Sequence, residues 1–345
     1  MNVKAREIAP DRPVVDAGAP LLEVESLCVT FNTPTGPLPV VDHVGFSIER
    51  GATMGLVGES GAGKSVTAMA LNGLVSAPIA EVTGRVLFDG NELVGMAERD
   101  LAHIRGRDIG MIFQEPRRSL HPSMTVGAQI ARVVRHHTKC SKREAWARAV
   151  DMLQRVGISD PKRNAKAYPH TFSGGMCQRV MIALALACRP KLLIADEATT
   201  ALDVTVQKQI LELISDLQSD LGLSVIFITH DLGVVASMCD TVAVMYAGQV
   251  VEQSQTREVF ASPKHPYTAG LLDSVADLTT TGDWLGFIPG TVPALGHWPA
   301  GCRFHTRCTH CVEPTCTAAP IPLTVAPTGS VRCARHAELH LKGIS

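Results

Sequence analysis

The fold is decided by the stretch Gly58-Glu59-Ser60-Gly61-Ala62-Gly63-Lys64-Ser65. An apolar run, Met54 to Val57, precedes it, and with a helix expected after it the pattern is typical of a phosphate loop for a nucleoside triphosphate. The glycines let successive backbone N–H groups point at the β-phosphate, and the helix adds its positive end. Lys64 supplies a charge for the β- and γ-phosphates, and Ser65 a hydroxyl ligand for Mg²⁺. An ordinary glycine-rich turn is the alternative.

A second apolar run has the composition of a buried parallel strand and ends on two acidic residues. Leu192 to Ala195 leads directly into Asp196 and Glu197. A carboxylate at the tip of a buried strand has no packing role but can hold Mg²⁺ through water, so we assign Asp196 to the metal. Glu197 is then the general base that polarises the attacking water. A solvated acidic turn is the alternative.

Two more polar residues follow apolar runs. His230 comes after Ser224 to Thr229, and Gln114 comes after Ile109 to Phe113. A lone histidine is more often structural, but beside the other strand tips the imidazole of His230 would reach the γ-phosphate. The amide of Gln114 could bridge Mg²⁺ and the attacking water, although this residue alone would mean little.

The rest of the chain divides into an antiparallel part, a helical part and an appendage. Leu21 to Phe31 and Val82 to Phe88 are strand-like, and the Asp89-Gly90 pair after the second is a favoured hairpin turn. Between Ile130 and Gly157, apolar residues recur at three- and four-residue steps, which predicts a helical insertion in an α/β core. The stretch from Ser262 onward is rich in Pro, Thr, Cys and His and lacks such periodicity, so we place a boundary near Pro263.

Composition limits the class of protein. The chain has 345 residues, 46% of them hydrophobic, with a formal net charge of −1 and a pI near 6.9. It can bury one large core and has residues left for an accessory module, and nothing in its charge favours nucleic acid. Residues 1–20 are polar, so we expect a loose tail and no signal peptide. The longest apolar run, Val180 to Cys188, is about half of what a membrane-spanning helix needs, so any membrane role is played through partners.

In order, these motifs resemble the nucleotide-binding subunit of an ATP-binding cassette (ABC) transporter, over Leu21 to about Phe260. Six motifs match: Gly58 to Ser65 (Walker A), Gln114 (Q-loop), Ser173-Gly174-Gly175 (signature), Leu192 to Glu197 (Walker B), Ala201-Leu202-Asp203 (D-loop) and His230 (switch). The resemblance implies an α/β fold: a P-loop NTPase (RecA-like) core with an N-terminal antiparallel β subdomain and an inserted helical subdomain at about 115–189. The cassette would span 21–262, with a small extension at 263–345.

In this family two cassettes close head to tail, which gives the signature its meaning. Ser173, Gly174 and Gly175 would face the γ-phosphate of ATP held by the partner, with neither subunit complete alone. Phe31 is the candidate for stacking on adenine, and a core role is nearly as plausible. Phe172 stands where the family usually has Leu, which we interpret as a tolerated apolar change, and Met176 is familiar in one importer branch.

The C-terminal segment points to that branch. His265-Pro266-Tyr267-Thr268, Ile288-Pro289-Gly290 and Gly301 to Phe304 resemble the extension of the dipeptide, oligopeptide and nickel importers. Five of the ten cysteines crowd between residues 302 and 333, and without a secretion signal such crowding favours metal over disulfides. The resemblance implies a [4Fe–4S] cluster with Cys302, Cys308, Cys316 and Cys333 as its ligands. A zinc ion would accept the same four cysteines, and a third interpretation is that they are simply reduced thiols. Cys311 is an extra thiol that could displace one of the four ligands.

We therefore expect a peripheral ATPase at the cytoplasmic face of the cell membrane, energising import of peptides or similar solutes. The resemblance implies a second, distinct cassette chain, two permease subunits and an extracytoplasmic substrate-binding protein as partners. The segment Glu115 to Thr125 is where the family couples to permease helices. Alternatives are a nickel or other solute importer, or a non-transport ABC ATPase of the repair or translation type. A nucleotide-binding metal sensor is disfavoured because Glu197 and His230 are intact.

Overall fold

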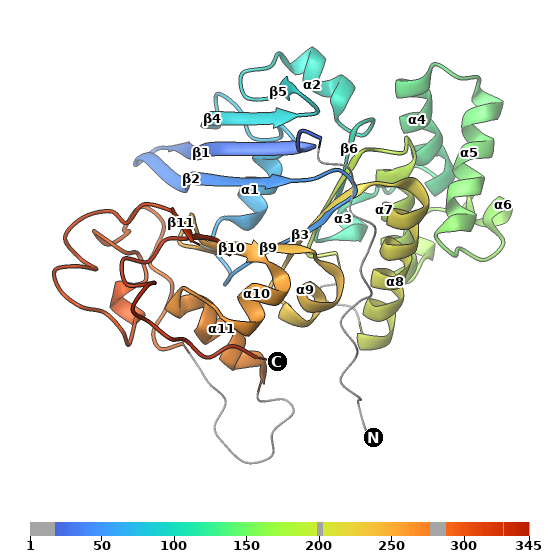
Figure 1. The fold of residues 1–345 in the computed structure, drawn as a ribbon. Coiled ribbons are helices and arrows are strands. Elements are labelled where there is room, and N and C mark those ends of the chain that lie inside the picture. Colours follow the sequence, from blue (N-terminus) through green and yellow to red (C-terminus); the bar gives the residue numbers. More distant parts are fainter. Residues whose placement is uncertain (1–17, 199–202, 277–287, 327, 345) are drawn as a thin grey trace, which may run out of the picture.

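Two β-sheets frame the molecule, and the computed structural model describes residues 18–198, 203–276, 288–326 and 328–344 (Figure 1). The smaller sheet is antiparallel, with strand order β2-β1-β4-β5. Its strands are β1 (Leu22–Thr33), β2 (Gly36–Ile48), β4 (Ala80–Phe88) and β5 (Asn91–Glu92). The Asp89-Gly90 hairpin is confirmed, because both residues have positive φ and Phe88 pairs with Asn91.

The larger sheet carries the predicted buried strands. Its order among the described residues is β11-β12-β10-β9-β3-β8-β7-β6, parallel from β9 to β6. The strands are β3 (Thr53–Val57), β6 (Ile109–Ile112), β7 (Leu192–Asp196), β8 (Ser224–Thr229), β9 (Thr241–Tyr246), β10 (Gln249–Gln255), β11 (Thr324–Ala326) and β12 (Gly329–Val331). Every residue of β3, β6, β7 and β8 is buried, as expected for strands covered on both faces.

The helices cover the parallel sheet and build a separate lobe beside it (Figure 1). The α-helices are α1 (Lys64–Leu71), α2 (Glu98–Ile104), α3 (Pro116–Ser119), α4 (Val126–Thr138), α5 (Lys142–Arg155), α6 (Pro161–Asn164), α7 (Gly174–Leu186), α8 (Val204–Leu221), α9 (Leu232–Met238), α10 (Thr256–Ala261) and α11 (Pro266–Ala276). Short 3₁₀ turns lie at Pro169–Thr171 and His305–Arg307. No helix in the described part of the chain is long and apolar enough to cross a membrane.

The helical stretch expected over residues 130–157 is two helices, α4 and α5, rather than one. Lys139 ends α4 in a left-handed conformation with φ of 52°. Ser141 then starts α5 with a capping box, its hydroxyl accepting from the Glu144 N–H while the Glu144 carboxylate accepts from the Ser141 N–H. The predicted apolar positions are buried as expected: Ala145, Ala149, Met152, Leu153 and Val156.

The C-terminal extension is packed onto the cassette. Its strand β12 pairs antiparallel with β10, so the extension continues the large sheet. Tyr267 and Phe304 from the extension pack against Tyr246 of β9, with ring centroids 4.6 and 5.2 Å from that of Tyr246. The extension lies at the opposite end of the molecule from α4 and α5 (Figure 1).

Candidate functional site

Parallel pairing lines up the strand ends that carry the predicted site. Val57 pairs with Thr229, Asp196 with Ile228, and Ile112 with Ala195. The residues that follow these positions therefore leave the sheet at one edge. Open α/β sheets bind their ligands outside this carboxyl edge.

The phosphate loop follows β3 and packs tightly on its neighbours. Gly58 has φ of 150°, and a Cβ there would lie 2.1 Å from the carbonyl oxygen of Met245, so only glycine fits. Gly63, with φ of 99°, precedes α1, whose first residue is Lys64. The Lys64 Nζ donates to the Gly58 oxygen at 2.7 Å and the Glu59 oxygen at 3.0 Å. The ammonium therefore lies within the curve of the loop, beside the amides that would hold phosphate.

The two predicted Mg²⁺ ligands meet. The Ser65 hydroxyl donates to Asp196 Oδ1 at 3.0 Å. Asp196 is 6% exposed, and its burial raises the pKa of the carboxyl group. Burial also lowers the pKa of Lys64, which the nearby charges of Glu197 and Asp196 oppose. A hydroxyl and a carboxylate side by side beside a lysine match the oxygen donors that hold Mg²⁺ in phosphate-loop enzymes.

The three predicted catalytic residues also converge, although they come from different strands. The Gln114 Nε2 donates to Glu197 Oε2 at 2.5 Å, and His230 Nδ1 lies 3.6 Å from Glu197 Oε1. Glu197 has φ of 46°, an uncommon backbone conformation outside glycine. Its carboxylate therefore sits between an amide and an imidazole, next to the Ser65 and Asp196 pair. A water held there could be oriented and deprotonated.

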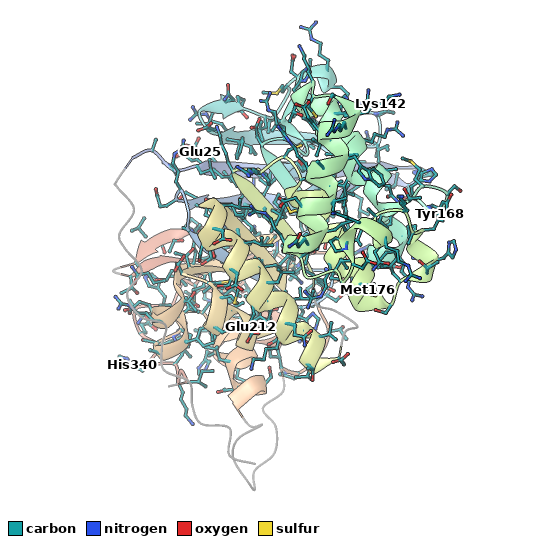
Figure 2. All side chains as sticks on the ribbon, turned by 90° about the vertical axis from the view of Figure 1, so that its right-hand side faces the viewer. Glu25, Lys142, Tyr168, Met176, Glu212 and His340 are labelled. Atoms are coloured by element: carbon teal, nitrogen blue, oxygen red, sulfur yellow. The ribbon has the colours of Figure 1, made fainter. Side chains whose placement is uncertain are left out.

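The signature residues start helix α7. The Ser173 hydroxyl accepts from the Met176 N–H at 3.3 Å as the N-cap, and Ser173 is exposed. Among the described residues no hydrogen bond joins Ser173 to the phosphate loop. Phe172 is 4% exposed in the core of the helical part. Met176 lies on the same side of the molecule as Tyr168, away from His340 in the extension (Figure 2).

Two other predicted site residues have structural contacts. Asp203 caps α8, its carboxylate accepting from the Val206 N–H at 2.9 Å, whereas Ala201 and Leu202 lie outside the described residues. Phe31 is partly buried against the core of the antiparallel sheet, opposite Leu38. The contacts of Phe31 are those of a core residue, and they leave its part in adenine binding as a prediction.

The cysteines of the extension gather around one pocket. Cys302, Cys308, Cys316 and Cys333 line it together with Phe304 and other side chains. Burial raises the pKa of the Cys302 thiol to about 12 and that of Cys308 to about 11. In the described chain, no three sulfur atoms of this group lie within 4.8 Å of one another. Cys311, the fifth thiol, interacts with Cys316.

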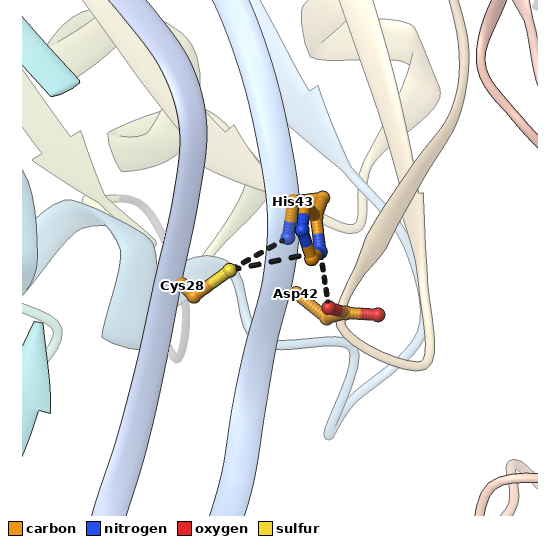
Figure 3. A group of neighbouring side chains, drawn as sticks. All are labelled: Cys28, Asp42 and His43. Carbon is orange, nitrogen blue, oxygen red and sulfur yellow. Dashed lines mark hydrogen bonds and ion pairs between the residues drawn. The ribbon is translucent and has the colours of Figure 1, made fainter. Parts of the chain in front are cut away.

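Another Cys, Asp and His group lies on the antiparallel sheet (Figure 3). His43 Nδ1 is 2.6 Å from Asp42 Oδ1 and 3.7 Å from Cys28 Sγ. Because one ring nitrogen faces both partners, the imidazole cannot relay a proton between them. The second Asp42 oxygen is ion-paired with Arg303 and accepts from Gln249 at 2.9 Å. The group therefore ties the sheet to the extension.

Two contacts at the nucleotide site were missed by the sequence analysis. The Gln207 amide donates to Asp231 Oδ2 at 3.0 Å, which joins the start of α8 to the residue after His230. The Glu59 N–H donates to the Tyr267 hydroxyl at 2.8 Å, which joins the phosphate loop to the extension. The first contact could have been suspected from the sequence, because Asp231 directly follows His230. Nothing in the periodicity of the sequence pairs residues 59 and 267.

The fold and this edge of the sheet define a P-loop ATPase. Residues 41–200 match the model of the ABC transporter family, and residues 251–316 match that of the oligopeptide/dipeptide transporter C-terminal region. The chain is 49% identical to the oligopeptide transport ATP-binding protein OppD of Salmonella typhimurium, covering 90% of this chain and 92% of that protein. OppD of Bacillus subtilis is also 49% identical, over 90% and 88%.

Solved structures agree with this assignment. The dimeric, post-hydrolysis structure of the ATP-binding cassette MJ0796 with ADP and Pi matches with a TM-score of 0.62 at 26% identity, covering 68% of this chain and 99% of that one. The structure of cbiO1 from Clostridium perfringens matches with a TM-score of 0.59 at 31% identity, covering 70% and 90%. The chain belongs to the ATP-binding proteins of ABC transporters, in their oligopeptide/dipeptide family. It is an ATPase that energises import.

Proposed function

We propose that this chain powers the uptake of oligopeptides. The observation that carries the proposal is the convergence of Gln114, Glu197 and His230 beside the phosphate loop, in a chain so similar to OppD proteins over nearly its full length. Those relatives are oligopeptide transport ATP-binding proteins. A hydrolytic site in this setting supplies energy, while the solute is selected by other subunits.

In the proposed mechanism the loop amides and Lys64 bind the triphosphate, and Ser65 and Asp196 hold Mg²⁺. When bound there, Mg²⁺ would neutralise charge on the phosphate oxygens. Glu197 accepts a proton from the attacking water, while Gln114 orients that water and His230 contacts the γ-phosphate. Phe31 stacks on the adenine ring.

The proposed active unit contains two cassettes. Ser173 is exposed at the start of α7, where Gly174 leaves open space around its Cα, so another surface can approach. An N-terminal helix end with a free face favours an anion, and in a head-to-tail pair this anion is the γ-phosphate bound by the other cassette. We propose a distinct chain as the partner, with Asp203 at the interface.

The other proposed partners are two permease subunits, and a substrate-binding protein that acts through them. Residues 115–125, directly after Gln114, form the permease contact. Within this segment, α3 carries the exposed residues Arg117 and Arg118. The chain works as a peripheral subunit at the cytoplasmic face of the membrane.

We also propose that Cys302, Cys308, Cys316 and Cys333 hold a [4Fe–4S] cluster with a structural role. Its support is the pocket that the four cysteines line together. Four thiolates are the usual ligand set of such a cluster, and zinc would accept the same four. Binding would require that the buried thiols lose their protons.

The transport proposal is tested on the complex of this chain with its permeases, in vesicles with the substrate-binding protein. We expect a mixture of short peptides to stimulate ATP hydrolysis and labelled peptide to accumulate. Stimulation by Ni²⁺ and not by peptides would instead assign the complex to metal uptake.

A further inference from the structure

An ion pair joins the C-terminal extension to the phosphate loop. Arg307 Nη1 lies 2.7 Å from Glu59 Oε2, and Arg307 Nη2 lies 3.1 Å from Glu59 Oε1. The contact is therefore a two-pronged guanidinium–carboxylate pair, which fixes orientation as well as distance. The Arg307 side chain is only 4% exposed, and that of Glu59 is 31% exposed. Glu59 is the second residue of the phosphate loop.

The guanidinium is held firmly from its own side. Its Nε donates to the carbonyl oxygen of Pro289 at 2.7 Å, and Nη2 also donates to that of Ile288 at 3.3 Å. Nη1 lies 3.4 Å from the Tyr246 hydroxyl. Every nitrogen of the group therefore has a partner, so Arg307 is a fixed point to which the loop attaches.

A second contact from the extension holds the backbone of the same loop residue. The Glu59 N–H donates to the hydroxyl of Tyr267, which is fully buried. On the inner side of the loop, Lys64 reaches the Glu59 carbonyl at 3.0 Å. Side chain, N–H and C=O of Glu59 are thus all engaged, two of them by residues beyond position 262.

This arrangement matters because the loop binds phosphate through the direction of its amides. An ordered loop presents those amides without a reorganisation cost when ATP arrives. Arg307 also balances a carboxylate that would otherwise stand unpaired beside a triphosphate. We propose that Arg307 is a positioning residue for the phosphate loop, through which ATP affinity depends on the folded extension.

The link reaches the cysteine pocket. Arg307 ends the 3₁₀ turn His305–Arg307, which lies between Cys302 and Cys308 in the chain. Arg307 therefore connects the segment that carries two of the pocket cysteines to Glu59. The inference rests on ATP binding at this loop and needs neither the transported solute nor the kind of metal.

The first test compares two arginines of the extension in the purified full-length chain. Arg307→Lys removes the two-pronged contact. Arg332→Lys is the matched control, because Arg332, which is partly buried, also donates to backbone carbonyls, those of Val250 and Ile321, away from the loop. Binding of a fluorescent ATP analogue should weaken about 5- to 50-fold in Arg307→Lys, within the range of coupled neighbouring residues. Arg332→Lys should bind as the unmodified chain does.

A second variant tests the same pair without altering the extension. Glu59→Gln removes a negative charge beside the phosphates, so the change in charge alone would tighten ATP binding. If the contact with Arg307 orders the phosphate loop, losing this contact weakens ATP binding instead. We expect weaker binding, a rise in KM for ATP larger than any fall in kcat, and a double variant no weaker than Arg307→Lys alone. Unchanged or tighter binding in Glu59→Gln, additive losses in the double variant, or an equal loss in Arg332→Lys would overturn the proposal.

Discussion

Gln114 and Glu197 are hydrogen-bonded at 2.5 Å, although 83 positions separate them in the chain. The bond joins Gln114, two residues after the end of β6, to Glu197, which directly follows β7, and the two strands are parallel neighbours. The Gln114 amide therefore donates to one oxygen of the carboxylate that we assign as the general base. His230 Nδ1 lies near the other oxygen of this carboxylate. This contact gives the predictions on hydrolysis their physical basis.

Glu197→Gln should preserve ATP binding and lower turnover by roughly 10²- to 10⁴-fold, the usual contribution of a general base. The amide keeps the shape of the side chain but cannot accept a proton from water. Turnover is measured as phosphate release by the assembled transporter, and binding with a fluorescent ATP analogue. Near-normal hydrolysis would remove Glu197 from this role.

Lys64→Ala should weaken ATP binding itself by at least about 10-fold, since a charge-assisted contact of roughly 1.5–3 kcal/mol is lost. Its ammonium lies inside the phosphate loop, bonded to two loop carbonyls. Lys142→Ala, on the exposed start of α5, is the matched control and should bind ATP normally. Unchanged affinity in Lys64→Ala contradicts the assignment of the loop.

Ser173→Arg should leave nucleotide binding by the isolated chain intact and abolish hydrolysis by the assembled transporter. Ser173 is exposed and makes no hydrogen bond to the phosphate loop in the described chain, so a bulky cation there obstructs only the partner's ATP. Binding is followed by fluorescence and hydrolysis by phosphate release. Weakened binding in the isolated chain would place Ser173 at its own nucleotide instead.

Protein purified without oxygen should be brown and contain about four iron atoms and four inorganic sulfides per chain. Cys302→Ser should bleach the visible absorbance, whereas Cys311→Ser should keep it, because Cys311 is the extra thiol. Iron, sulfide and zinc are determined on the same samples. A colourless protein with stoichiometric zinc would reject the cluster.

Asp42→Asn should destabilise the chain by about 1–2 kcal/mol at pH 7, as expected for a hydrogen-bonded charge pair. Burial opposes ionisation of Asp42, but the bond to His43 and the charge of Arg303 outweigh it, so the pKa of Asp42 is lowered. A lowered carboxyl pKa stabilises the fold above the unfolded value and loses that effect as the pH falls through the folded value. The difference between variant and parent, measured by urea unfolding, should therefore shrink below about pH 4. A constant difference would exclude the charge as its source.

The nucleotide site was predictable because its chemistry is local in sequence. The runs before Gly58, Asp196 and His230 are buried on both faces and so are continuously apolar, and parallel pairing then brings their ends together. Strand β2 could not be predicted in this way, because Pro37 and Pro39 interrupt the run of strand-forming residues. It tolerates them because it is an edge strand of its sheet.

The contacts of the extension could not be predicted. Arg307 meets Glu59 across 248 positions, and Arg303 meets Asp42 across 261. Both depend on how an aperiodic segment folds back over the cassette. A charged residue in such a segment looks like any solvated one until its neighbours are known.

The pairing of β12 with β10 has one more consequence. Without the extension, β10 would present unpaired N–H and C=O groups from Glu252 to Ser254 along a sheet edge, which is a template for aggregation. With it, the sheet ends instead at β11, a strand of three residues, too short to recruit another chain readily. A cassette truncated after residue 262 would therefore be prone to self-association through the exposed backbone of β10. By covering this edge, the extension disfavours polymerisation of the cassette.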